Sequence, residues 1–183
     1  MTISSTPLPG LLVVRPTIHR DERGWFMESW NAADFALLGL RADFVQDNLS
    51  LSHEGVVRGL HFQAPPAEQT KLVRCVEGCI LDVALDIRHG SPTFGQWHAE
   101  TLSARNGLAM LIPPGFAHGF AALTEGATVA YKCDKHYSPA LAMGICWDDP
   151  ALAIQWPKGA IVSKADASWP ILADLTKYFT YKE

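Results

Sequence analysis

CILDVALDIR, residues 79–88, is the stretch that best indicates the fold class. Its apolar residues, Cys79, Leu81, Val83, Leu85 and Ile87, alternate with Asp82, Asp86 and Arg88. A period of two places alternate side chains on opposite faces of an extended chain, so this stretch predicts a β-strand with one apolar face.

Working outward from this strand, short apolar runs recur on both sides, separated by turn residues such as HEG, APP and IPPG. Many short strands at this spacing predict a mostly β domain, built as a sandwich or a barrel. The runs lie at residues 11–15, 25–30, 44–52, 56–63, 71–76, 98–103, 109–113 and 127–134.

Helices are expected to be few, short and peripheral. Residues 31–40 are one candidate, with Asn31 as N-cap and Phe35, Leu37 and Leu38 as its apolar side. Residues 165–177 are another, with Pro170 near its start. Residues 147–157 are rich in proline and predict a turn-rich crossing.

The composition bounds the function. The chain has 183 residues, which suits a single domain spanning residues 1–183, and it is 48% hydrophobic and 19% charged. A net charge of −4 disfavours nucleic acid as a partner. We expect no membrane partner and no secretory signal, because no apolar run is long enough to span a bilayer and the N-terminus lacks a basic start.

The chain has four cysteines: Cys75, Cys79, Cys133 and Cys146. They form no CxxC pair, which predicts reduced thiols and a cytoplasmic protein.

Polar side chains recur inside the predicted strands. RGLHFQ, residues 58–63, carries Arg58 and His61. Further polar residues occupy comparable positions elsewhere: Gln46, Asn48, Lys71, His118 and Tyr131. A lone strand histidine is more often a core residue bonded to a backbone carbonyl. Because several polar groups recur, the sequence favours a barrel with a polar lumen of ligand size.

Arg58 and His61 are three residues apart, so regular alternation puts them on opposite faces. Gly59 lies between them, and a glycine within a strand often marks a bulge that redirects side chains. If both residues serve one site, the regular pairing must break near Gly59. The alternative is that Arg58 faces solvent.

The residues in such a lumen could move a proton next to a carbonyl group. His61 could act as the base, Lys71 could stabilise the developing oxyanion, and Tyr131 could return a proton from another direction. The chain has no GxSxG or strand-linked GxGxxG motif. A metal held by His61 and His118 is the competing interpretation, but the ligand spacing of divalent-metal barrels is missing.

Seven blocks in order now identify a resemblance: DERGWFMES, FVQDNLSLS, RGLHFQAPPAEQTKLVR, DVALDIRHGSPTFGQW, IPPGFAHGFAAL, VAYKCDKHYSP and ICWDDPALAIQWP. From about residue 11 to residue 175, the chain closely resembles the dTDP-4-dehydrorhamnose 3,5-epimerase family. The resemblance implies a cupin-type jelly-roll β-barrel that acts as a homodimer without metal or organic cofactor. It implies inversion of C3 and C5 of dTDP-4-dehydro-6-deoxy-D-glucose, giving dTDP-4-dehydro-L-rhamnose.

The resemblance also assigns residues. The family's base falls on His61, its oxygen-stabilising lysine on Lys71, its acid on Tyr131, and the carboxylate partner of the histidine on Asp166. The first three agree with the roles argued from the residues. Asp166 alone would be interpreted as an acidic residue at a helix start.

The family's substrate contacts carry over as well. The resemblance implies that a segment with Arg23, Phe26 and Glu28 is lent to the partner subunit's site. It places sugar and diphosphate contacts on Gln46, Asn48 and Arg58, the thymine contact on Tyr137, and His118 in the pocket lining.

This chain departs from the family pattern at Ala140, Ala142 and Cys146, which replace polar or charged types. We expect these changes to alter surface or subunit contacts and not the chemistry. Two alternatives remain at this stage. One is a relative that inverts a single carbon of a related nucleotide sugar. The other is a cupin that only binds such a sugar, or a ketoisomerase on the same scaffold.

Overall fold

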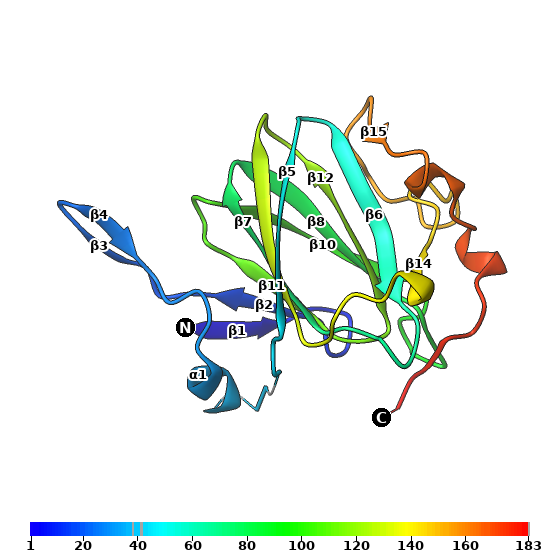
Figure 1. Ribbon diagram of the computed structural model, residues 1–183, viewed down its shortest axis with the longest axis horizontal. Coiled ribbons are helices and arrows are strands. Elements are labelled where there is room, and N and C mark those ends of the chain that lie inside the picture. The colour runs from blue at the N-terminus through cyan, green and yellow to red at the C-terminus, as the bar shows by residue number, and fades with distance from the viewer. Residues whose placement is uncertain (38, 41, 183) are drawn as a thin grey trace.

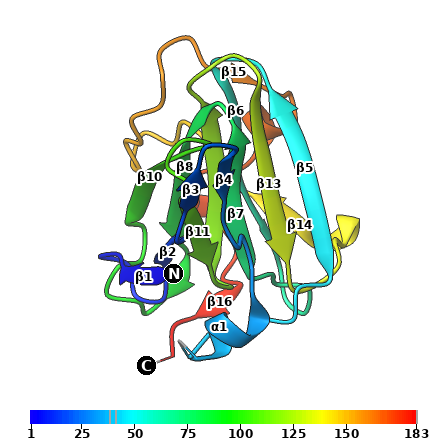
Figure 2. The ribbon, with the colours of Figure 1, turned by 90° about the vertical axis from the view of Figure 1, so that its left-hand side faces the viewer.

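Two six-stranded sheets face one another in the computed structural model, which describes residues 1–37, 39, 40 and 42–182 (Figure 1; Figure 2). The first sheet has the order β1-β2-β11-β7-β13-β5. Its strands are β1 (Thr2–Ser5), β2 (Leu12–Arg15), β11 (Ala109–Ile112), β7 (Lys71–Glu77), β13 (Ala127–Cys133) and β5 (Gln46–Ser52).

The second sheet has the order β10-β8-β12-β6-β14, and β15 pairs with β6 in parallel. Its strands are β10 (Trp97–Ser103), β8 (Cys79–Asp86), β12 (Phe116–Ala122), β6 (Val56–Gln63), β14 (Ala142–Gly144) and β15 (Ile161–Val162). From β5 to β8 and from β10 to β14, successive strands alternate between the two sheets. This connectivity is that of a jelly roll, so the predicted β-barrel is confirmed.

The strand predicted from CILDVALDIR is β8, and both of its faces are buried. Val83 and Leu85 face outward and pack under the C-terminal segment. Ile80 and Ala84 face the space between the sheets, and Asp82 shares that inner face with no exposed surface. The alternation in β8 therefore separates two buried environments. The face of β8 that carries Asp82 points into the barrel.

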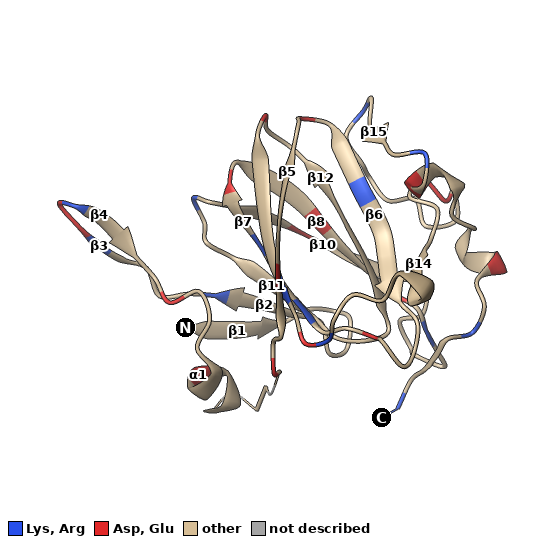
Figure 3. Ribbon diagram, viewed as in Figure 1, with Lys and Arg blue, Asp and Glu red and all other residues tan. Residues whose placement is uncertain are grey.

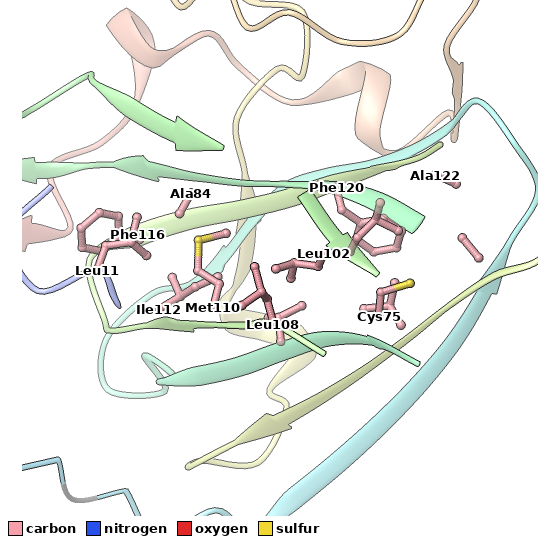
Figure 4. Packing of buried hydrophobic residues seen from close by; sticks show 14 of the residues in the cluster. Leu11, Cys75, Ala84, Leu102, Leu108, Met110, Ile112, Phe116, Phe120 and Ala122 are labelled. Atoms are coloured by element: carbon pink, nitrogen blue, oxygen red, sulfur yellow. The ribbon is translucent and has the colours of Figure 1, made fainter. Parts of the chain in front are cut away.

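The main core fills much of the space between the sheets. Figure 4 shows Ala84, Met110 and Phe116 lying together there, with Leu102 and Phe120 further along. Burying each large apolar side chain of this kind contributes roughly 1.5–3 kcal/mol to folding. Most Lys, Arg, Asp and Glu residues lie toward loops and edges, while the blue band on β6 in Figure 3 is Arg58.

Smaller elements surround the sheets. A two-stranded hairpin, β3 (His19–Asp21) with β4 (Gly24–Phe26), projects away from the barrel (Figure 1). Near the C-terminus, β16 (Phe179–Thr180) pairs with β9 (Arg88–His89). Three 3-10 helices are η1 (Pro139–Leu141), η2 (Asp166–Ser168) and η3 (Leu172–Asp174). No helix in the described ranges is long and apolar enough to cross a membrane.

The helix predictions are correct only in part. Residues 31–40 contain α1 (Ala32–Leu37), and the side-chain oxygen of Asn31 accepts the backbone N–H of Ala33 at 3.0 Å, as expected of an N-cap. Phe35 is buried, but Leu37 is 86% exposed and does not belong to an apolar face. Leu38 lies outside the described residues.

Two further predictions are wrong at their boundaries. Residues 165–177 hold η2 and η3 in place of an α-helix, because Pro170 interrupts the hydrogen bonding between them. The strand predicted for residues 25–30 ends at Phe26, where the hairpin ends. The turn-rich crossing at residues 147–157 is confirmed.

Candidate active site

The pairing of β6 breaks at Gly59, as predicted. His118 lies opposite His61, but Phe120 lies opposite Arg58, so the register shifts between these pairs. Gly59 has a φ of +140°, and a Cβ there would lie 2.5 Å from the Cα of Gly119 on β12. Only glycine allows so close an approach of the two backbones. The irregularity lets Arg58 and His61 serve one cavity.

That cavity lies between β5, β7 and β13 of the first sheet and β6 and β12 of the second, and it has a volume of about 540 Å³. The volume is in the range of small-molecule sites. It brings together six of the sequence-predicted residues: Arg58, His61, Lys71, His118, Tyr131 and Asp166. The prediction of a polar lumen is therefore confirmed. Arg58 lines the cavity and is also exposed to solvent, and its guanidinium donates to Ser52 Oγ at 3.0 Å.

His61 pairs with Asp166 at the cavity wall. Its Nε2 lies 2.6 Å from Asp166 Oδ1, and the backbone N–H of Gly59 donates to the other carboxylate oxygen at 3.4 Å. Burial acts to raise the pKa of Asp166, but the His61 contact and the backbone N–H outweigh it and hold that pKa below its usual value. The carboxyl is thus ionised near neutral pH. The pair matches the arrangement in which a carboxylate fixes a histidine tautomer and stabilises the imidazolium.

Lys71 and Tyr131 stand on the facing sheet, at the start of β7 and in β13. Burial lowers the pKa of Lys71, while the nearby Cys133 and Asp82 act in the opposite direction. Burial, helped by Cys133, raises the pKa of Tyr131, and Arg58 opposes this. The phenol therefore keeps its proton at neutral pH, which suits an acid.

A second histidine–carboxylate pair lies deeper in the barrel, and sequence reasoning missed its acidic member. His118 Nε2 lies 2.7 Å from Asp82 Oδ1, and both side chains are nearly or fully buried. The other Asp82 oxygen has no hydrogen-bond partner among the described residues. The only sequence signal was an acidic residue on a strand that is otherwise rich in apolar side chains.

A smaller space of about 270 Å³ continues from the main cavity and shares His61, Lys71, Tyr131 and Asp166 with it. It adds three predicted binding residues: Gln46, Asn48 and Tyr137. Gln46 donates to Asn48 Oδ1 at 2.9 Å and accepts the backbone N–H of Tyr137 at 2.8 Å, so the three form one connected wall.

Ala142 also lines this smaller space, together with Met143 and Trp169. Ala142, which we expected to alter surface or subunit contacts, therefore also borders the candidate site, and its effect on subunit contacts remains a prediction. Strand β14 brings it beside Gln63 of β6, at the edge of the site.

Arg23, Phe26 and Glu28 do not reach the cavity of their own chain. Arg23 and Phe26 lie on the projecting hairpin, where Arg23 pairs with Asp21. Glu28 follows the hairpin and accepts a hydrogen bond from Asn31 at 3.1 Å. Their assignment to the partner's site remains a prediction.

The two cavity histidines do not share a ligand cluster. Each pairs through Nε2 with its own carboxylate, and no group of three or more His, Cys, Asp or Glu residues in the described chain is placed to hold a metal ion.

Comparison with known proteins gives a consistent family. The family model for dTDP-4-dehydrorhamnose 3,5-epimerase matches residues 5–174. The chain belongs to the dTDP-4-dehydrorhamnose 3,5-epimerase family. The enzyme of that name from Salmonella typhimurium is 47% identical over 175 residues, which cover 94% of this chain and 96% of the relative. The one from Methanothermobacter thermautotrophicus is 46% identical, covering 94% and 95%.

Solved structures of this epimerase family share the fold. The dTDP-6-deoxy-D-glucose-3,5-epimerase of Legionella pneumophila, solved in complex with dTDP-4-keto-L-rhamnose, has a TM-score of 0.95 at 43% identity, with 100% and 99% of the two chains covered. A 3′-monoepimerase of Streptomyces bikiniensis, in complex with dTDP-quinovose, has a TM-score of 0.88 at 35% identity, covering 92% of this chain and 86% of that one. The family fold thus includes proteins named for two-carbon and for one-carbon inversion.

Proposed function

We propose that the protein inverts C3 and C5 of dTDP-4-dehydro-6-deoxy-D-glucose to give dTDP-4-dehydro-L-rhamnose. The observation that carries this proposal is the placement of His61 and Tyr131 on facing sheets around one cavity. A base and an acid on opposite sides of a sugar ring can remove a proton from one face and return one to the other. The family relationship supplies the substrate class.

Each inversion proceeds without oxidation or reduction. His61 takes the proton from the carbon beside the C4 ketone, and the C–H electron pair moves into an enolate whose charge rests on O4. The Lys71 ammonium stabilises that oxygen, and Asp166 stabilises the imidazolium. Tyr131 then donates its proton to the opposite face of the carbon as the ketone re-forms. His61 and Tyr131 recover their protonation states by exchange with solvent, so the step needs neither metal nor organic cofactor.

The wall formed by Gln46, Asn48 and Tyr137 binds the nucleotide part of the substrate in this proposal. Tyr137 is 57% exposed and can stack on the thymine, a contact worth roughly 1–3 kcal/mol per base. Arg58 offers a planar, permanently charged fork to the diphosphate. We place the reaction in the cytoplasm, a setting that keeps the four cysteines as the free thiols they are here.

A coupled assay tests the proposed function. The protein is incubated with dTDP-4-dehydro-6-deoxy-D-glucose, NADPH and a reductase that acts on dTDP-4-dehydro-L-rhamnose. Consumption of NADPH that depends on the protein supports two-carbon inversion. Formation of a singly inverted sugar without NADPH consumption would assign it instead to the one-carbon type represented by the Streptomyces bikiniensis neighbour.

Tyr131→Phe separates proton removal from proton return. The variant lacks the phenolic proton, while His61, Lys71 and Asp166 are untouched. We expect formation of inverted product to fall on the order of 10², the lower range for loss of a general acid. Uptake of solvent deuterium with retained configuration should persist. Wild-type inversion rates, followed by proton NMR, would remove Tyr131 from the acid role.

We also propose that the protein acts as a homodimer, with the β3–β4 hairpin lent to the partner. The outer face of the first sheet supports this, because it exposes apolar side chains that a monomer would leave in water: Leu49 is 70% and Leu51 57% exposed. Trp25 and Phe26 on the hairpin are also exposed. A twofold dimer would cover these surfaces and carry Arg23 toward the other cavity.

Complementation between two inactive variants tests this exchange. If Arg23 serves the partner's site, a heterodimer of Arg23→Ala and His61→Ala chains contains one complete site. Mixing and reassembling the two at equal amounts should restore roughly a quarter of wild-type activity, given random pairing of subunits. Activity no higher than that of the separate variants would place Arg23 in its own chain's site or outside both.

A further inference from the structure

The segment that carries Asp166, residues 161–170, touches the barrel at few points. At one end, β15 pairs with Val56 and Val57 of β6. At the other end, the carbonyl of Pro170 accepts the backbone N–H of Cys146 at 2.8 Å. Between these ends most side chains are exposed: Ser163, Lys164, Ala165, Ala167 and Ser168. Asp166 is buried, and Trp169, later in the same segment, is half-buried.

Trp169 lies in the space that a side chain at Gly144 would occupy. A Cβ added to Gly144 would lie 2.5–2.6 Å from three atoms of the indole ring, Cδ1, Nε1 and Cε2. Gly144 is the residue of β14 directly opposite His61 of β6. Opposed residues in paired strands project to the same face, so the indole occupies the position next to the candidate base.

Shape, and not hydrogen bonding, holds this indole in place. Its Nε1 is buried and has no hydrogen-bond partner among the described residues. The ring also lines the smaller part of the cavity, with Met143 and Ala142. The indole ring supplies contact area against the backbone of Gly144. It lies on the same segment as Asp166, the other side chain of that segment that points inward.

We propose that Trp169 is a positioning residue that seats on Gly144 and thereby holds Asp166 against His61. This inference rests on the proposed function, because it assigns Asp166 its effect through His61. The His61–Asp166 contact of 2.6 Å leaves little tolerance, since a hydrogen bond weakens steeply when its atoms move apart or out of line. Without the contact between Trp169 and Gly144, the segment between β15 and Pro170 can move, and Asp166 moves with it.

Trp169→Ala tests this positioning role. We expect kcat to fall by about 10–100-fold, within the range for a displaced catalytic group, with KM changing less than threefold. Leu172→Ala, which removes packing between the following C-terminal residues and the second sheet, away from Gly144, is the matched control and should leave kcat and KM unchanged.

Trp169→Phe separates the ring from its N–H group. Phenylalanine keeps an aromatic ring on Gly144, so we expect most of the lost kcat to return. If Trp169→Phe is as impaired as Trp169→Ala, the N–H group acts directly on the substrate, and the positioning role is wrong.

Two double variants show through which residue Trp169 acts. Trp169→Ala should add little to the loss already caused by Asp166→Asn, because both changes remove the same effect. Gly144→Ala should impair the wild-type chain, since its methyl group meets the indole, but should cause no further loss when Trp169 is already alanine. Effects that multiply in both pairs would contradict the proposal.

Failure of this inference is distinguishable from failure of the proposed function. If the wild-type protein exchanges no substrate proton, the function is wrong. If it does so and folded Trp169→Ala, checked by its thermal transition, retains wild-type kcat, only the role of Trp169 is overturned.

Discussion

Replacing His61 with alanine is expected to lower solvent-deuterium uptake into the substrate by about 10⁴, the upper range for loss of a general base. The reason is geometric as well as chemical. His61 lines the cavity, and its Nε2 lies 2.6 Å from the buried, ionised carboxylate of Asp166. Proton NMR in D₂O measures this loss directly. Calorimetry should show a dTDP affinity within about threefold of wild type, because the wall formed by Gln46, Asn48 and Tyr137 is unchanged.

His53→Ala is the matched control for this variant. His53 Nδ1 also lies 2.6 Å from a carboxylate, that of Glu125, but both side chains are exposed on loops outside the cavity. Deuterium uptake should therefore stay at the wild-type rate. A His61→Ala protein that exchanges as fast as the His53 variant would remove His61 from the mechanism.

Lys71→Met is expected to lower kcat by about 10³, the upper range for loss of one oxyanion stabiliser. The enolate then forms without a cation beside O4. Because burial lowers the pKa of Lys71, the wild-type ammonium loses its proton at lower pH than a free lysine. The wild-type rate should accordingly decline on the alkaline side, and this decline should be missing from the small residual rate of the variant.

Lys71→Arg keeps a positive charge that stays protonated at high pH. It should recover part of the lost rate, and the alkaline decline assigned to Lys71 should disappear. Lys158→Met, at an exposed position outside the cavity, should behave as wild type. Unchanged kcat in Lys71→Met, measured by the coupled assay across pH, would show that the enolate oxygen is stabilised elsewhere.

The sequence predicted strands best where one side of the strand differs from the other. The predicted range 56–63 is identical to β6, and the bulge at Gly59 followed from the three-residue spacing of Arg58 and His61. Strand β12 was missed because all seven of its residues are buried, so Phe116–Ala122 shows no alternation. Strand β11 is also fully buried but was predicted from its apolar run, whereas β12 is rich in Ala and Gly, which are uncommon in strands.

Contacts between segments that are distant in sequence limited how much of the site could be predicted. His61, Lys71 and Tyr131 could be chosen from local chemistry, since polar groups inside strands are costly and need a reason. Asp166 is 105 positions from His61, and only family resemblance pointed to it. Asp82 as partner of His118, and Gly144 as the seat of Trp169, depend on strand register and segment packing, which local sequence does not specify.

The most direct test of the central claim is proton NMR of dTDP-4-dehydro-6-deoxy-D-glucose with the wild-type protein in D₂O. The facing base and acid predict deuterium at both C3 and C5, with conversion to dTDP-4-dehydro-L-rhamnose. Deuterium at one carbon only would contradict the two-carbon assignment. No exchange at either carbon, with the protein folded, would contradict the catalytic roles given to His61, Lys71, Tyr131 and Asp166.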